Sequence, residues 1–127
     1  MDKRTYERWL KTLADKRAPA EAEAKRLIAA RRMDAAAAVV QTADDSIYGA
    51  VAIGRLFRER LELLAKEGVH AGNRAEAEEV FRHALHWMQR AYPEPHTAVE
   101  AEDWERGRAE DRSKLVAILG YDPKAGG

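Results

Sequence analysis

The sequence predicts an all-α protein of five or six helices in antiparallel hairpins, forming a compact bundle or a short array of helical repeats. Good helix formers (alanine, glutamate, arginine and leucine) dominate the 127 residues. No segment alternates apolar and polar residues with β-branched side chains, as a strand would. Apolar residues instead recur at spacings of three and four. We expect one domain over residues 1–120 and a flexible C-terminal tail over residues 121–127.

One helix is expected at the centre of the fold, over Ser46–Lys66. Its apolar residues form a wide band, which is typical of a helix covered by neighbours on more than one side. Asp44, Asp45 and Ser46 precede the band as candidate N-caps, and Gly68 follows the last turn as a C-cap. We expect the other helices to cover this one.

Three helices are expected before the central one. The first two are Lys3–Lys16 and Ala20–Arg31, separated by Pro19, because proline removes a backbone hydrogen bond and disfavours helix in the preceding residue. Asp34 is placed to cap a short third helix over residues 35–43. One face of the first helix carries an apolar stripe whose spacing predicts core positions: Tyr6, Trp9, Leu10 and Leu13.

Two more helices are expected after the central one. Asn73 and Thr97 are their candidate N-caps, and we expect the helices over Arg74–Tyr92 and Thr97–Leu119. Gly107 is the position where the last helix is expected to break or bend.

Composition excludes several classes of function. The 22 basic and 22 acidic residues balance, which argues against a dedicated nucleic-acid binder or a polybasic membrane surface. The lack of cysteine excludes disulfides, thiolate zinc sites and a cysteine nucleophile. No signal peptide or membrane span of about 20 apolar residues is visible, so we expect a soluble, cytoplasmic protein.

Residues 61–98 carry a pattern of small and larger apolar residues on either side of a glycine turn. It consists of Leu61, Leu64, Ala65, Gly72, Ala77, Phe81, Ala84 and Leu85, followed by Pro95 and His96. This pattern resembles a tetratricopeptide repeat, most closely the longer version found in kinesin light chains. The resemblance implies a helical hairpin that binds peptides or proteins and performs no catalysis.

We therefore expect a non-catalytic interaction or assembly module that needs no cofactor, as a subunit of a larger complex or a homo-oligomer. Its expected contact surface is the groove between the central helix and the one that follows. The expected rim residues are Phe57, Leu61, Phe81, His83, Trp87 and Arg90.

A first alternative is an enzyme that uses magnesium. Glu76 and Glu79, followed by Glu100 and Asp103, form two pairs of carboxylates on neighbouring helices, and hard cations prefer such oxygen ligands. The pattern resembles that of all-α nucleotide pyrophosphohydrolases of the MazG kind, which would make these four residues the magnesium ligands. Because Glu79 lies away from the apolar face of its helix, a solvated face explains the same spacing.

A second alternative is a transition-metal site. Glu79, His83 and His86 lie on one side of a helix, at a spacing that can bind zinc, iron or manganese. The stripe faces outward, so a solvated or partner-facing role explains it equally. Further ligands would come from His70, His96 or Asp103.

A third alternative is contact with nucleic acid. Residues 1–34 hold ten Lys/Arg and six Asp/Glu, whereas residues 74–110 hold five and nine. Charge complementarity between helices, between copies or with a partner explains the same distribution. The candidate phosphate contacts are Lys16, Arg17, Lys25, Arg26, Arg31 and Arg32.

A fourth alternative is a ribonuclease. Arg90 and His96 are an arginine and a histidine separated by five residues, a spacing that resembles the motif of HEPN-type ribonucleases.

Overall fold

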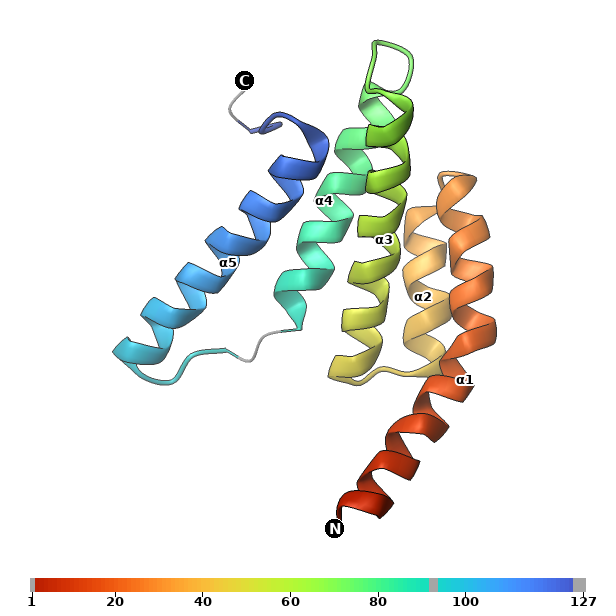
Figure 1. Cartoon of the computed structure of the whole chain (residues 1–127), viewed down its shortest axis with the longest axis vertical. Coiled ribbons are helices and arrows are strands. Elements are labelled where there is room, and N and C mark those ends of the chain that lie inside the picture. The colour runs from red at the N-terminus through yellow and green to blue at the C-terminus, as the bar shows by residue number, and fades with distance from the viewer. Residues whose placement is uncertain (1, 92–93, 125–127) are drawn as a thin grey trace.

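The computed structural model describes residues 2–91 and 94–124, and within them it contains five α-helices and no strand, which confirms the all-α fold (Figure 1). None of the helices in these ranges is long and apolar enough to cross a membrane. The helices are α1 (Lys3–Ala29), α2 (Met33–Ala43), α3 (Ile47–Glu67), α4 (Arg74–Arg90) and α5 (Ala98–Leu119).

Helix α3 is the central element, as the sequence predicts. It packs against each of the other four helices, most extensively against α4. The Ser46 hydroxyl accepts a hydrogen bond from the Tyr48 backbone N–H at 3.2 Å, and this caps the first turn. Gly68 ends the helix with a φ of 98°, a conformation that disfavours residues with a Cβ.

The helices pair as antiparallel hairpins on either side of α3. Helices α1 and α2 form one hairpin, while α4 and then α5 follow on the other side (Figure 1). The largest fully buried side chains include Phe57, Phe81 and Ile28. Gly54 lets α3 and α4 approach closely, because a Cβ there would lie 3.2 Å from the backbone nitrogen of Met88.

Two predictions at the N-terminal end of the chain are wrong. Helix α1 continues through Pro19 as one helix of 27 residues rather than two. Proline removes one backbone hydrogen bond, and the helix responds with a bend: Figure 1 shows its first half inclined to its second. Asp34 lies inside the first turn of α2, and Arg32 occupies the N-cap position instead.

The later helix ends follow the prediction in part. The Thr97 hydroxyl accepts a hydrogen bond from the backbone N–H of Glu100, as a capping residue should. Asn73 occupies the N-cap position of α4, but its side chain accepts from the His70 N–H at 2.7 Å and so shapes the preceding loop. Helix α5 runs through Gly107 without a break. Helix α4 ends at Arg90, and the predicted end at residue 92 lies outside the described ranges.

Tyr121 and Asp122, which follow Gly120, contact the bundle. Tyr121 packs against the core, and the guanidinium of Arg74 lies 4.8 Å from the centroid of its ring. Asp122 forms an ion pair with Arg112. The predicted tail thus begins with ordered contacts, and its flexibility stays a prediction.

Candidate interaction surface

The first half of α1 extends beyond the bundle (Figure 1). We call residues Lys3–Lys16 the α1 arm. The buried residues of α1 are Ala24 and Ile28, and both lie after Pro19. The apolar stripe of the arm is therefore only partly covered.

Two aromatic residues of the arm are exposed rather than buried. Tyr6 is 42% exposed and Trp9 is 44% exposed, so their predicted core positions are wrong. Helical spacing places them on one face of the arm, and their ring and hydroxyl contacts across to α3 are with Tyr48 in its first turn. The spacing of apolar residues predicts an apolar face, but it does not indicate whether another helix covers that face.

Three aromatic rings attach the arm to α3. The Tyr6 and Tyr48 hydroxyl oxygens lie 2.7 Å apart, within hydrogen-bonding distance. The Trp9 ring meets the Tyr48 ring edge-on, with centroids 6.1 Å apart, and lies 6.0 Å from the Tyr6 ring. The hydrogen bond with Tyr6 raises the pKa of the Tyr48 hydroxyl, because it favours the neutral phenol.

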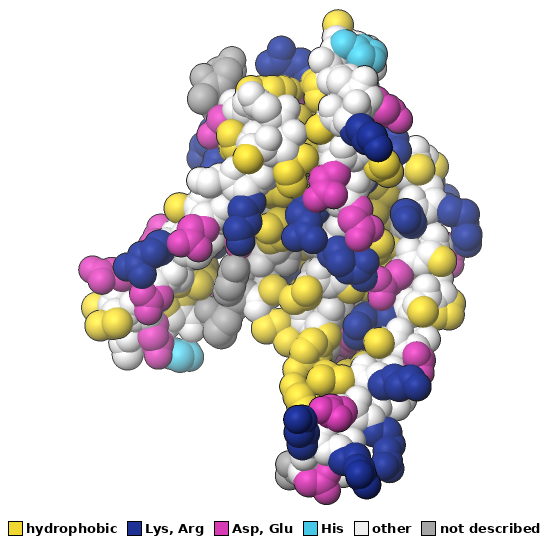
Figure 2. Space-filling model, viewed as in Figure 1, with side chains coloured by type: hydrophobic (Ala, Val, Ile, Leu, Met, Phe, Trp, Pro, Cys, Tyr) yellow, Lys and Arg dark blue, Asp and Glu magenta, His cyan; other side chains and the backbone are white. Residues whose placement is uncertain are grey.

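Two aliphatic residues of α3 extend this cluster. Ile47 is 49% exposed and Val51 is 53% exposed, one helical turn apart. Figure 2 shows hydrophobic side chains gathered over this region, beside the projecting half of α1. We call Tyr6, Trp9, Ile47, Tyr48 and Val51 the α1–α3 patch. Val51 also borders a groove of about 400 Å³ between α3, α4 and α5.

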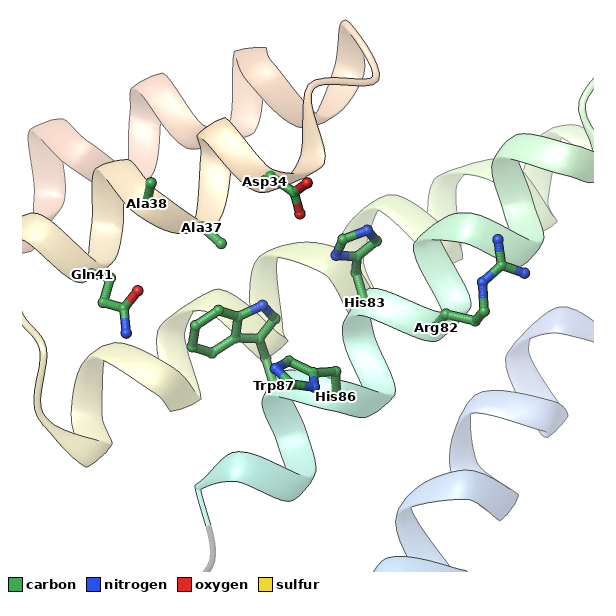
Figure 3. Close-up of a pocket in the computed structure, with 8 residues that line it drawn as sticks. All are labelled: Asp34, Ala37, Ala38, Gln41, Arg82, His83, His86 and Trp87. Carbon is green, nitrogen blue, oxygen red and sulfur yellow. The ribbon is translucent and has the colours of Figure 1, made fainter.

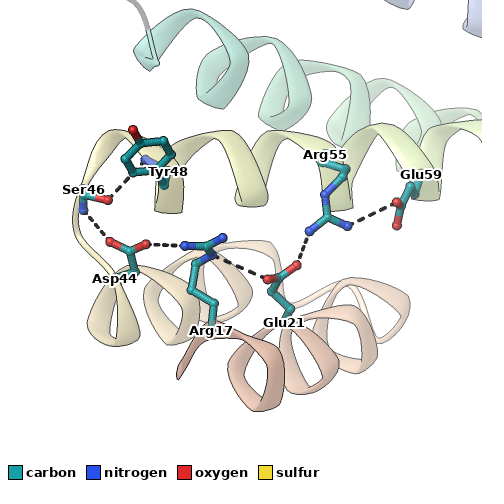
Figure 4. A network of polar contacts seen from close by, with 7 residues as sticks. All are labelled: Arg17, Glu21, Asp44, Ser46, Tyr48, Arg55 and Glu59. Carbon is teal, nitrogen blue, oxygen red and sulfur yellow. Dashed lines mark hydrogen bonds and ion pairs between the residues drawn. The ribbon is translucent and has the colours of Figure 1, made fainter. Parts of the chain in front are cut away.

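A network of charged residues fixes the base of the arm (Figure 4). Arg17 donates a hydrogen bond to the Asp44 carboxylate at 2.7 Å and lies 3.6 Å from a carboxylate oxygen of Glu21. Glu21 in turn pairs with Arg55 of α3, and Asp44 also accepts from the Ser46 N–H at 3.0 Å. The network therefore joins α1, the turn after α2 and the start of α3.

Asp44 is the most enclosed acid of this network, with only 3% of its side chain exposed. Burial opposes its ionisation, but the hydrogen bonds from Ser46 and the guanidinium of Arg17 outweigh that effect. The pKa of Asp44 is consequently lowered below its usual value. Sequence reasoning treated Asp44 only as a helix cap and Arg17 only as a phosphate contact.

Part of the predicted rim lies in the core. Phe57 and Leu61 are 0% exposed and Phe81 is 1% exposed, so none of the three forms a rim. The reason is that α3 and α4 pack directly against each other, which closes the expected groove between them.

The remaining rim residues lie elsewhere. His83 and Trp87 line a pocket of about 380 Å³ between α4 and α2, which alanines of α2 leave open (Figure 3). His83 stacks on Phe57 with ring centroids 5.1 Å apart. Arg90 is exposed and lies 5.4 Å from the centre of the Trp87 ring. The pocket residues are Asp34, Ala37, Ala38, Gln41, Arg82, His83, His86 and Trp87.

The carboxylates of the magnesium alternative do not converge. Because α4 and α5 are antiparallel, Glu76 at the start of α4 lies near the end of α5, far along the helix from Glu100 and Asp103. Glu76 pairs with Arg60 at 2.9 Å instead.

The remaining acids of both metal alternatives have partners of their own. Glu79 pairs with Arg31 at 2.9 Å, Asp103 pairs with Arg106 at 3.1 Å, and Glu100 accepts from the His96 N–H at 2.7 Å. Within residues 2–91 and 94–124, no three acidic or histidine side chains gather as a metal site would require. The predicted set of Glu79, His83 and His86 is thus not assembled there either.

The basic residues of the nucleic-acid alternative divide into two groups. Arg17 and Arg31 are engaged in the ion pairs with Asp44 and Glu79 described above. Lys16, Lys25, Arg26 and Arg32 are exposed. Arg90 and His96, the pair that resembles the ribonuclease motif, are exposed on either side of the connection between α4 and α5.

Comparisons of the chain with protein-family models, with curated proteins and with solved structures found no match. The tetratricopeptide resemblance therefore stays a prediction.

Proposed function

We propose that this chain is a non-catalytic assembly module that binds another protein chain through the α1–α3 patch. The supporting observation is a pair of half-exposed aromatic rings, Tyr6 and Trp9, on a helical arm that extends from the bundle. Large aromatic side chains clustered on a surface are typical anchors of protein interfaces.

The size of the patch fits this role. Covering the exposed half of one large aromatic side chain removes roughly 100 Å² from water, which is worth about 2–3 kcal/mol. Trp9 and Tyr6 can each contribute on this scale, and Ile47 and Val51 add aliphatic area. The rings are already ordered by their contacts with Tyr48, so a partner orders few side chains on binding.

The competing proposals have weaker support. In the magnesium alternative, Glu76, Glu79 and Asp103 are each paired with an arginine. In the nucleic-acid alternative, Arg17 is enclosed by two carboxylates.

Affinity capture from the native cell, after brief crosslinking and with quantitative mass spectrometry, tests the proposal. We expect the double substitution Trp9→Ser and Ile47→Ser to reduce the captured partner at least about tenfold, because each removes an apolar contact. Leu63→Ser is the matched control, since Leu63 lies on the same helix as Ile47 and is equally exposed, at 49%.

Circular dichroism should show the same helix content in all three proteins, because none of the substituted side chains is buried. Equal capture by the wild-type chain and the double variant would refute the proposed role of the patch.

A further inference from the structure

We propose that the partner is a second copy of this chain, and that two copies form a two-fold dimer in which the α1 arm of each binds the first half of α5 of the other. This inference rests on the proposed function, for which it names the partner. It starts from a second projecting segment, residues Ala98–Glu110, which we call the α5 arm.

The α5 arm is as poorly covered as the α1 arm. The buried residues of α5 are Asp111, Leu115 and Leu119, all in its second half. Val99 near its start is 69% exposed, more than any other large hydrophobic residue among those described. Figure 1 shows the first half of α5 standing away from α4 and α3.

The two arms carry opposite charge. The α1 arm holds five Lys/Arg and two Asp/Glu, whereas the α5 arm holds two Lys/Arg and five Asp/Glu. Few of these charges are neutralised within their own arm: Lys3 pairs with Glu7 at 4.0 Å, and Asp103 pairs with Arg106 at 3.1 Å. In the described part of the chain, the exposed side chains that form no ion pair include Arg4, Arg8 and Lys11 on one arm and Glu102, Glu105 and Glu110 on the other.

Three of the unpaired basic residues of the α1 arm form a stripe. Arg4, Arg8 and Lys11 follow the i, i+4, i+7 spacing of one helix face. The turn angle of an α-helix places this face opposite Tyr6 and Trp9, which contact α3. The basic stripe therefore points outward, away from its own bundle and toward whatever lies beside the arm.

The placement of the arms favours a second copy. Both project at the end of the bundle where α3 begins, on opposite sides of it, and they do not pack against each other (Figure 1). A two-fold axis through that end brings each basic arm to the acidic arm of the other copy, so the same contact forms twice. The α1–α3 patch lies at the same end of the bundle. The interface between the two copies covers this patch, which gives the interface an apolar centre with charged flanks.

A second copy also satisfies both arms at once. A different partner would need an acidic surface for one arm and a basic surface for the other. The chain as a whole is electrically balanced, with 22 basic and 22 acidic residues, so net repulsion does not oppose self-association.

Charge reversal in the purified full chain tests the inference, with sedimentation velocity as the measurement over a range of protein concentrations. We expect the wild-type chain to form a dimer at low salt and to dissociate at high salt, because the arm contacts are exposed and therefore screened. Reversal of three charges on either arm should weaken the dimer by at least about 100-fold, since each arm then meets an arm of its own sign. The α1-reversed variant carries Arg4→Glu, Arg8→Glu and Lys11→Glu, and the α5-reversed variant carries Glu102→Lys, Glu105→Lys and Glu110→Lys.

Rescue decides whether the arms pair with each other. An equimolar mixture of the two reversed variants should form a heterodimer, and a chain that carries all six substitutions should form a homodimer again. Such restoration also shows that the variants fold. The control variant carries Lys25→Glu, Arg26→Glu and Arg32→Glu, which reverse three exposed basic residues outside the α1 arm. It changes the net charge of the chain by the same amount as the α1-reversed variant. This control should dimerise as the wild-type chain does.

The outcomes separate this inference from the proposed function. A wild-type chain that stays monomeric at every concentration and salt would overturn the dimer, while capture of a different protein that depends on Trp9 would leave the proposed function standing. A dimer that forms but is not restored by mixing the reversed variants would overturn the arm-to-arm contact. A dimer insensitive to Trp9→Ser and Ile47→Ser would remove the patch from the interface.

Discussion

Gly49 occupies a position with no room for a side chain, and Gly49→Ala gives the sharpest test of the structure. A Cβ at this position would lie 1.9 Å from the carbonyl oxygen of Asp44. An ordinary contact begins at 3.4 Å, so the carbonyl would have to move by about 1.5 Å. The backbone of Gly49 itself is helical, so space rather than backbone conformation requires the glycine.

The expected loss of stability follows from what that movement disturbs. Alanine gains about 1 kcal/mol over glycine in a helix interior. Overpacking costs about 1–3 kcal/mol. Displacing Asp44 weakens its hydrogen bonds with Arg17 at 2.7 Å and with the Ser46 N–H at 3.0 Å, and bonds to charged groups are worth about 1.5–3 kcal/mol each. We expect a net loss of about 2–4 kcal/mol in the free energy of unfolding, or roughly 10 °C in Tm.

Urea unfolding followed by far-UV circular dichroism measures this loss. Gly107→Ala is the matched control, because a Cβ at Gly107 meets nothing within 4 Å and the residue lies inside α5. This control should stabilise the protein by about 0.5–1 kcal/mol. If Gly49→Ala were as stable as the wild-type chain while Gly107→Ala gained stability, the turn between α2 and α3 would not have the described geometry.

Three further predictions concern the core, the charged network and the arm. Phe57→Ala should lower the free energy of unfolding, measured in urea, by about 3–5 kcal/mol, because it empties a fully buried site. Leu63→Ala, at a position 49% exposed, should change it by only about 0.5 kcal/mol. Similar losses for the two variants would contradict the described core. Because the pKa of Asp44 is lowered in the folded state, its ionised carboxylate adds to the free energy of unfolding at pH values above the unfolded-state pKa, and this contribution is lost as the pH falls through the folded-state pKa. The difference in free energy of unfolding between the wild-type chain and Asp44→Asn should therefore narrow below about pH 4. A constant difference would argue against the ionised network. Tyr6→Phe should lower the pKa of Tyr48, because the Tyr48 hydroxyl loses its hydrogen-bond partner. An alkaline absorbance titration measures this change. An unchanged titration would mean that the two hydroxyls do not interact in solution.

Apolar spacing and caps predicted the central part of the fold well. The band over residues 46–66 predicted a helix covered on several sides, and α3 contacts every other helix. Ser46 and Gly68 mark the ends of that helix in the structure as they do in the sequence. Such local signals survive in the fold because capping and helical periodicity depend only on nearby residues.

Signals that depend on distant segments were misread. The sequence predicted that Pro19 separates two helices, but tertiary contacts after it and the charged network at Arg17 hold one bent helix together. Phe57 and Phe81 were predicted as rim residues of a groove, but each is buried by the opposing helix of the pair α3 and α4.

The sequence by itself determined the helix content, the central helix, its caps and the opposite charge of residues 1–34 and 74–110, because each depends on residue type and short-range spacing. Only the tertiary structure decided which apolar faces are covered and which acids pair with which bases. Tyr6 and Trp9 have the spacing of core residues but lie on an arm that the bundle covers only in part. Glu76 and Glu100 have the spacing of metal ligands, but the antiparallel path of α4 and α5 separates them. Burial and ion pairing depend on which residues are neighbours in space. The helical spacing of residues along the sequence does not specify those neighbours.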